Sequence, residues 1–308
     1  MRTAILAITL AVSGCTSLPH QREELTQSAT ATAPQGAPVT VPRARQFDLV
    51  SRINGRTYRV FVAAPFQADP AKRYPVIYLL DGNAYFATTA DALTRQTALG
   101  IASPAIVVGV GYPTDDPKEI ARLRFFDLTP SVSKDPARAG TGGGGDAFLR
   151  ILEEELMPFV SARYPADAAQ RVLWGQSVGG LTVLRSMFRK PGLFSTYILS
   201  SPSIWYNERE VLGDEASFSR SVTSQSPRLK ILVTSAGDEQ YRGPDLKYLA
   251  DANLSRMVDN ATELAERLAR LPSGNVTVER IIFPGELHGT VPQASLSRTL
   301  RFAFPAKE

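Results

Sequence analysis

The chain has 308 residues, 44% of them hydrophobic, which is enough for one sizeable core and favours a single domain over two small ones. Its formal net charge of +4 comes from basic residues that are dispersed rather than clustered, which argues against a nucleic-acid-binding protein. The single cysteine, Cys15, excludes intramolecular disulfides and cysteine-rich metal sites, so we expect neither a metal nor another cofactor.

The N-terminus resembles a bacterial lipoprotein signal. A short charged start precedes an apolar run, residues 3–12, that is too short to span a bilayer. Val12-Ser13-Gly14-Cys15 then resembles a lipobox, in which cleavage before Cys15 exposes the thiol that receives the lipid. Thr16 rather than Asp follows, which favours the outer membrane. We therefore expect a signal peptide over residues 1–14 and a lipid-anchored protein that faces the periplasm. The alternative is a buried, apolar Cys15 after an ordinary secretory signal.

Residues 15–45 are predicted to be a flexible tether, because Gln, Ser, Thr, Ala and Pro dominate there and no hydrophobic period appears. The folded domain should then cover residues 46–308. At its start, residues 47–51 and 56–63 are expected to pair as antiparallel strands around Asn54-Gly55, a hairpin turn signal.

Short buried strands then alternate with helical segments. The predicted strands are residues 76–80, 106–110, 172–174, 196–200, 229–235 and 276–283. This alternation predicts an α/β fold with a mostly parallel central sheet and helices on both faces.

The stretch Gly175-Gln176-Ser177-Val178-Gly179 follows the apolar run at 172–174 and precedes a helix-like segment. A strand, a sharp turn and a helix in this order form a nucleophile elbow. The two outer glycines leave room for the turn, which forces the central residue into a strained backbone conformation. Ser177 is therefore predicted to stand exposed at the tip of the strand as a nucleophile.

A serine needs a base to remove its proton, and the chain has two histidines. His20 lies in the polar N-terminal stretch, which leaves His288, directly after the last predicted strand. An acid is expected after the strand before that one, where Asp238 and Glu239 follow. The resulting order Ser, acid, His is the one that α/β-hydrolases use.

An acyl-transfer site also needs backbone N–H groups that hold the oxyanion. One should come from Val178, the residue after the nucleophile. The other should come from the loop after the strand at 76–80, where Gly82 lets the backbone approach a substrate closely and Asn83 offers its N–H. The alternative is that Asp81-Gly82 makes only a turn and that Asn83 caps a helix.

Five stretches together resemble the putative-esterase family of α/β-hydrolases, close to the siderophore-trilactone esterases of bacteria. They are residues 80–86, 124–130, 175–179, 201–205 and 284–289. The resemblance covers about residues 46–306 and implies a serine carboxylic-ester hydrolase that works through an acyl-enzyme. Many members of that group carry Glu before Gln at the end of the seventh strand, as Glu239-Gln240 does here, whereas Asp238 better fits the generic hydrolase acid. Adjacent loop residues point in different directions, so one acid should serve and the other face solvent, and the resemblance favours Glu239.

The resemblance also places the loop around Arg124 beside the site. Arg124 would meet an acidic substrate group there, or it would form a structural ion pair with Asp127. Trp205 and Tyr206 follow the strand at 196–200, at the edge where α/β sheets bind ligands. They would wall the acyl or aryl pocket, or they would pack in the core.

The expected partner is a small-molecule ester of siderophore, aryl or acetyl type. Two other functions fit the same sequence. One is an acyltransferase on the same fold, in which an alcohol or amine replaces water. The other is a non-catalytic, surface-binding lipoprotein.

Overall fold

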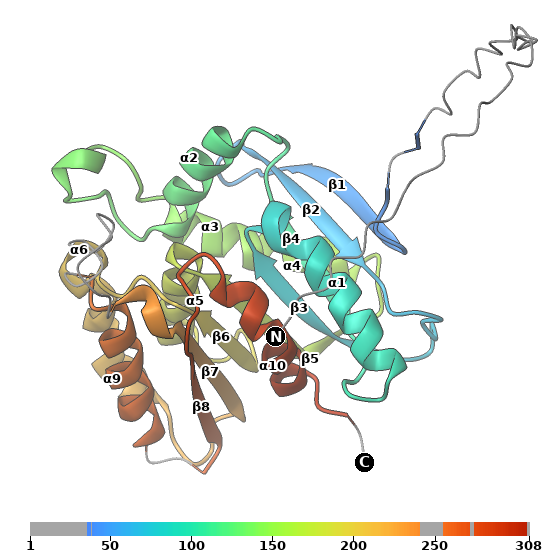
Figure 1. The fold of residues 1–308 in the computed structure, drawn as a ribbon. Coiled ribbons are helices and arrows are strands. Elements are labelled where there is room, and N and C mark those ends of the chain that lie inside the picture. Colours follow the sequence, from blue (N-terminus) through green and yellow to red (C-terminus); the bar gives the residue numbers. More distant parts are fainter. Residues whose placement is uncertain (1–35, 38, 241–254, 272–273, 307–308) are drawn as a thin grey trace, which may run out of the picture. The chain divides into compact units, whose positions relative to one another are not determined.

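A computed structural model describes residues 36–37, 39–240, 255–271 and 274–306 (Figure 1). The expected signal peptide, Cys15 and most of the expected tether lie outside these residues. The chain from Thr40 onward belongs to one compact unit, Thr40–Glu308, and its first strand begins at Ala44.

The sheet has eight strands in the order β1-β2-β4-β3-β5-β6-β7-β8. They are β1 (Ala44–Val50), β2 (Thr57–Ala63), β3 (Tyr74–Leu80), β4 (Ile106–Gly111), β5 (Ala166–Gln176), β6 (Thr196–Ser200), β7 (Leu229–Ala236) and β8 (Val276–Phe283). β1 and β2 form the expected hairpin, and β2 pairs antiparallel with β4. All other neighbouring strands run parallel, so the prediction of a mostly parallel sheet is confirmed.

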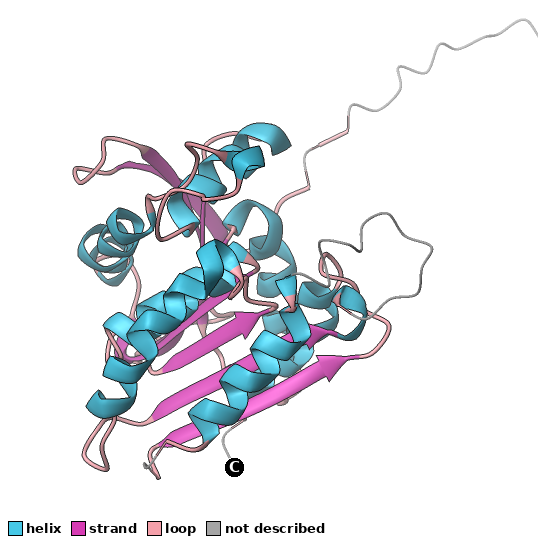
Figure 2. Ribbon diagram, turned by 90° about the vertical axis from the view of Figure 1, so that its left-hand side faces the viewer, coloured by secondary structure: helices cyan, strands magenta, loops and turns pink. Residues whose placement is uncertain are grey.

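Helices cover both faces of the sheet. They are α1 (Gly82–Ala98), α2 (Pro117–Leu128), α3 (Gly145–Ile151), α4 (Met157–Ser161), α5 (Val178–Arg189), α6 (Tyr206–Arg209), α7 (Glu215–Ser221), α9 (Met257–Ala269) and α10 (Val291–Ala303). A π-helical segment, η2 (Leu152–Leu156), joins α3 to α4, and η1 (Pro136–Arg138), η3 (Glu210–Asp214) and η4 (Gly237–Glu239) are short 3-10 helices. α1 and α10 lie on one face, and α5 and α9 lie on the other (Figures 1 and 2). Within the described ranges, no helix has both the length and the apolar character that crossing a bilayer would need.

Each face of the sheet has its own core, because successive side chains of a strand point to opposite faces. Ile77 of β3 belongs to the cluster that contains Phe86 of α1. The next residue, Tyr78, belongs to the cluster that contains Leu181 of α5. Burial on both faces fixes the register of the central strands, since a shift by one residue would exchange the two sets of side chains.

This register brings the carboxyl ends of the last four strands together. Gln176 at the end of β5 lies opposite Ser200 of β6, and Ser200 lies opposite Thr234 of β7. Ala236, the last residue of β7, lies opposite Phe283, the last residue of β8. The four segments that leave these strands therefore start along one edge of the sheet, where open α/β sheets bind ligands.

The turn from β5 into α5 has a strained backbone. Ser177 has φ 61° and ψ −121°, a conformation that costs about 1–3 kcal/mol for a residue with a side chain. Two backbone hydrogen bonds of 3.0 Å support it, from Ser177 N–H to Ser200 O and from Ser203 N–H to Ser177 O. Gly175 is needed as well, because a Cβ there would lie 2.4 Å from the carbonyl carbon of Gly179.

We expect Gly175→Ala to lower the free energy of unfolding by about 1–3 kcal/mol, because the added methyl group meets backbone that cannot move without opening the turn. Gly192→Ala is the matched control, since nothing lies within 4 Å of a Cβ at that position. It should change the stability by no more than about 0.5 kcal/mol. Denaturant unfolding of the three proteins measures both effects, and equal stability of the two variants would contradict this account of the turn.

Candidate active site

Ser177 lies at the elbow where the sequence predicts the nucleophile. It is half-buried, whereas its neighbours Gln176 and Val178 are buried, so the turn presents the serine side chain beyond the end of the sheet. Its Oγ lies 3.2 Å from Oγ of Ser203, and either hydroxyl can be the donor. Ser203 is buried in the loop after β6, and the sequence analysis did not single it out as a site residue.

His288 lies in the loop between β8 and α10, and its Nδ1 is 2.8 Å from Oε2 of Glu239. Glu239 belongs to η4, directly after β7, and is buried. Its other oxygen, Oε1, accepts hydrogen bonds from Ser201 Oγ at 2.9 Å and from Ala236 N–H at 3.1 Å. Both carboxylate oxygens are therefore hydrogen-bonded, as a buried carboxylate requires.

Of the two adjacent acids, Glu239 is the one whose carboxylate holds Nδ1 of the imidazole. Asp238 is half-buried, and its backbone N–H donates to Glu286 O at 3.1 Å. Asp238 thus connects η4 to the loop that carries His288 through its main chain. The geometry favours Glu239 as the acid of the site.

The other ring nitrogen of His288 has a partner that the sequence pattern did not predict. Nε2 lies 3.1 Å from Nε2 of Gln176, and the same amide nitrogen donates to the backbone O of His288 at 3.0 Å. Within the described residues, the hydrogen bonds of Ser177 Oγ and His288 Nε2 do not include one between these two atoms. Ser177 Oγ and His288 Nε2 thus have separate partners.

The two expected oxyanion donors lie in the first turns of two helices. Val178 begins α5, and Asn83 is the second residue of α1. The first N–H groups of a helix have no partner within it and carry its positive dipole end, so both are suited to an oxyanion. A Cβ on Gly179 would lie 3.4 Å from Oδ2 of Asp81, which shows that the two helix starts are adjacent.

Asn83 and Gly82 both keep the start of α1 close to β4 and to the residue that follows it. Asn83 Oδ1 accepts from Tyr112 N–H at 2.8 Å, and its Nδ2 donates to Tyr112 O at 3.0 Å. A Cβ on Gly82 would lie 2.7 Å from the carbonyl carbon of Gly109. The close approach that requires a glycine at position 82 is therefore to β4.

Arg124 does not pair with Asp127, so that alternative of the sequence analysis is wrong. Its Nε and Nη2 each donate to the carboxylate of Asp81 at 2.7 Å. Burial alone would lower the pKa of Arg124, but the charge and hydrogen bonds of Asp81 outweigh it and raise that pKa. Asp127 pairs with Arg56 at 3.2 Å, and burial raises the pKa of Asp127 to about 6 in spite of this cation. Arg124 is thus paired with Asp81, which directly precedes α1, and Asp127 is paired with Arg56, from the hairpin of β1 and β2. Both partners are distant in the sequence.

Trp205 and Tyr206 differ in their surroundings. Tyr206 is buried, its ring packs edge-on against Phe125 at 6.0 Å between centroids, and its hydroxyl donates to Ser131 O at 2.9 Å. These contacts match the core-packing alternative for Tyr206. Trp205 is half-buried and lies four residues after Ser201, in the loop that also carries Ser203.

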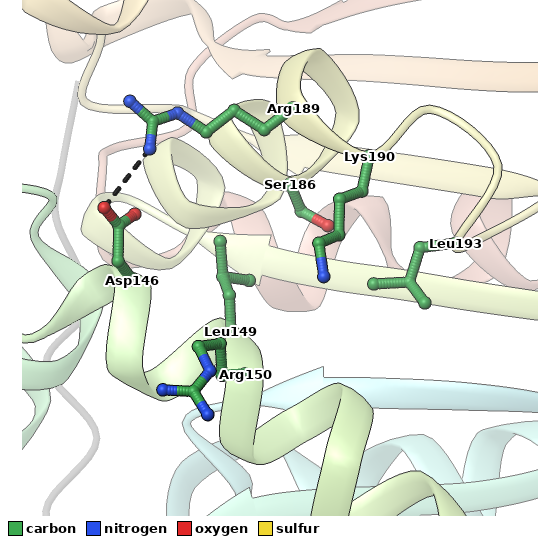
Figure 3. Close-up of a pocket in the computed structure, with 7 residues that line it drawn as sticks. All are labelled: Asp146, Leu149, Arg150, Ser186, Arg189, Lys190 and Leu193. Carbon is green, nitrogen blue, oxygen red and sulfur yellow. Dashed lines mark hydrogen bonds and ion pairs between the residues drawn. The ribbon is translucent and has the colours of Figure 1, made fainter. Parts of the chain in front are cut away.

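A cavity of about 160 Å³ lies elsewhere, between α3 and the C-terminal part of α5 (Figure 3). Its lining residues are Asp146, Leu149, Arg150, Ser186, Arg189, Lys190 and Leu193. Ser177 precedes the N-terminus of α5, so this cavity is separated from the elbow by the length of the helix. In the part of the chain that the structure describes, no group of three or more His, Cys, Asp or Glu residues is arranged to hold a metal ion.

Comparison with known proteins gives consistent matches. The family described as Putative esterase matches residues 51–274. The chain is 36% identical to the Ferri-bacillibactin esterase BesA of Bacillus subtilis, over 86% of this chain and 91% of that protein. It is 32% identical to a Siderophore triacetylfusarinine C esterase of Aspergillus fumigatus, over 87% and 95%. Among solved structures, the BES protein from Bacillus cereus superposes with a TM-score of 0.78 at 31% identity, over 89% of this chain and 99% of that one.

The family match runs from β2 to β7 and includes the elbow and η4, whereas β1, β8 and His288 lie outside it. The relatives are covered over nearly their whole length. The chain therefore belongs to the Putative esterase family and is a serine esterase of the α/β-hydrolase fold.

Proposed function

We propose that this protein hydrolyses carboxylic esters of siderophore type through a triad of Ser177, His288 and Glu239 and an acyl-enzyme. The observation that carries the proposal is the 2.8 Å hydrogen bond between His288 Nδ1 and the buried Glu239 carboxylate, beside the elbow that presents Ser177. It joins the base to the acid in the arrangement that serine hydrolases use.

The first half of the reaction forms an ester bond to Ser177. Nε2 of His288 takes the hydroxyl proton while Oγ attacks the carbonyl carbon of the substrate. Glu239 holds the Nδ1–H and stabilises the positive charge of the imidazolium. The N–H groups of Val178 and Asn83 hold the oxyanion. When the tetrahedral intermediate collapses, His288 returns the proton to the leaving alcohol.

The second half of the reaction frees the acid product. Water attacks the acyl group on Ser177 Oγ, and His288 Nε2 takes one of its protons. Collapse of this intermediate breaks the acyl–oxygen bond, and the proton passes back to the serine. The products are one carboxylic acid and one alcohol, and the enzyme returns to its initial state.

The substrate class rests on the relatives. The proteins at 36% and 32% identity are named for ferri-bacillibactin and triacetylfusarinine C, both siderophores by those names. Hydrolysis rates for a siderophore trilactone, an aryl ester and an acetyl ester of a polysaccharide would rank the classes. A rate constant for the trilactone below those of both other esters would contradict the siderophore assignment.

An acyltransferase uses the same residues and differs only in the acceptor. Product analysis with and without an added alcohol or amine separates the two reactions, because transfer yields a new ester or amide. A non-catalytic, surface-binding role does not fit a chain that belongs to an esterase family.

Ser177→Ala should abolish hydrolysis and labelling by a fluorophosphonate probe, because the nucleophile carries nearly all of the roughly million-fold effect of such a triad. Ser186→Ala, on the same helix but in the lining of the distant cavity, is the matched control and should keep both activities. Residual turnover of Ser177→Ala above about a few per cent of wild type would show that another group is the nucleophile.

Glu239→Ala should lower turnover by about 100-fold or more, because the imidazole loses the group that holds Nδ1. Asp238→Ala should stay within about threefold of wild type and serves as the neighbouring control. Steady-state kinetics of both variants decides between the two acids. Equal losses would point to a Ser-His pair that needs neither carboxylate for orientation.

For the N-terminus we propose lipid attachment at Cys15 and a location on the outer membrane, facing the periplasm. The support comes from the lipobox pattern and from the position of the candidate site, whose residues all lie beyond Thr40. Two or three acyl chains bury enough methylenes, at about 0.8 kcal/mol each, for stable anchoring.

Cys15→Ser should release an active esterase into the soluble periplasmic fraction, because the substitution removes the attachment thiol and leaves the folded unit unchanged. Fractionation of cells that express the two forms measures this. Recovery of the wild-type protein in the soluble fraction alone would show that the N-terminus is an ordinary secretory signal.

A further inference from the structure

We infer that Gln176 is a positioning residue that holds His288 in the tautomer and orientation of a general base until the substrate arrives. The inference rests on the proposed function, because it assigns a partner to the base of that triad. Gln176 is the last residue of β5, directly before Ser177, and is buried.

The orientation of the Gln176 amide follows from its contacts. The atom that lies 3.0 Å from the backbone O of His288 must be the nitrogen, since a carbonyl oxygen there would face another acceptor. The same nitrogen lies 3.1 Å from His288 Nε2. An amide has two N–H groups, so one can serve the backbone oxygen and the other the ring.

The tautomer of His288 follows from the amide. A donor at Nε2 requires that this ring nitrogen carries a lone pair, and the neutral imidazole then has its proton on Nδ1. Nδ1 is 2.8 Å from the Glu239 carboxylate, which can only accept. Gln176 and Glu239 thus hold opposite sides of the ring and select the same tautomer. In this state Nε2 is free of a proton, as a base must be.

The contact between the Gln176 amide and Nε2 also opposes protonation of the ring before the serine gives up its proton. A proton on Nε2 would bring two N–H groups face to face, so the imidazolium must break the contact with Gln176. During catalysis Nε2 therefore exchanges partners, from the Gln176 amide to the Ser177 hydroxyl. Ser177 makes the matching exchange, because its Oγ is hydrogen-bonded to Ser203 in the resting structure.

Other charged groups surround this unit and enter any pH dependence. Glu239 and Asp238 lie on η4, and Glu286 lies in the loop of His288. Arg124 of α2 reaches the backbone O of Gln176 at 3.5 Å, but its charge is paired with Asp81. None of these groups changes in the substitutions below, so a shift between the variants reports on position 176.

Two substitutions test the contact. Gln176→Met keeps the length of the side chain and removes its donor, whereas Gln176→Glu replaces the donor with a carboxylate that attracts the imidazolium. Gln240→Met is the matched control, because Gln240 is also buried and adjoins Glu239. Its amide nitrogen donates a hydrogen bond to Oδ2 of Asp259 at 2.7 Å instead of to His288. All variants are made in the full chain with His20→Asn, which leaves His288 as the one histidine for ¹⁵N NMR.

We expect Gln176→Met to shift the Nε2 resonance of His288, to keep the proton on Nδ1 and to lower kcat by about tenfold with KM within about twofold. Gln176→Glu should move the titration of His288, and with it the acid limb of the kcat profile, upward by about one pH unit or more. The sign follows because the carboxylate favours the protonated ring, so the base becomes available only at higher pH. Gln240→Met should leave the resonances and the titration at their wild-type positions.

The inference is overturned if His288 has the same resonances and the same titration in wild type, Gln176→Met and Gln176→Glu, whatever the loss of activity. Equal losses of activity in the two variants, without a change in the resonances or titration of His288, would mean that Gln176 only supports the fold. If either variant fails to fold, the other still gives the NMR result. The NMR measurement needs no turnover, so it tests the role of Gln176 independently of the triad. Failure of the triad proposal would instead appear as activity in Ser177→Ala.

Discussion

The strained turn at Ser177 is the constraint on which the rest of the site depends. Its backbone is held by the last residue of β6 and by Ser203 in the loop that follows. That loop also contains Ser201, which has φ 42° and whose hydroxyl donates a hydrogen bond to Glu239. The loop after β6 therefore contacts Ser177 at one point and Glu239 at another. The relative placement of Ser177 and Glu239 comes from this shared neighbour and from the register of the sheet, so the geometry is set before any substrate binds.

Two buried carboxylates on opposite sides of the elbow are stabilised in different ways. Glu239 has neutral donors on one oxygen and the imidazole on the other, so its charge is left to interact with His288. Asp81 is matched by the fork of Arg124 with two hydrogen bonds, which offsets the cost of burying both charges. Asp81 has φ 59° and immediately precedes α1. The ion pair therefore holds the strained residue from which α1 starts.

Local patterns in the sequence predicted most of the fold and the positions of Ser177 and His288 after β5 and β8. The hairpin around Asn54-Gly55, the buried strands and the elbow depend on turn chemistry and periodicity within a few residues, which a sequence displays directly. Local patterns left Asp238 and Glu239 both open, and only the family resemblance favoured Glu239, because successive residues of the short turn η4 point in directions that only the backbone path defines. The partner of Arg124 was missed for a related reason. Asp127 is three residues away and Asp81 is 43 residues away, and sheet topology, not chain distance, brings Asp81 close.

The segment that follows Trp205 and the segment between α2 and η1 depend on each other for their conformations. Asn207, Glu208 and Arg209 all have positive φ, between 45° and 66°, and three such residues in a row are costly without glycine. The side chain of Asn207 supports them, since it donates to Ser131 Oγ and Val132 O and accepts from Lys134 N–H. The segment after β6 is thus bonded to the segment between α2 and η1. Because the side chain of Asn207 joins the two segments, a change in the conformation of one segment requires a compatible change in the other.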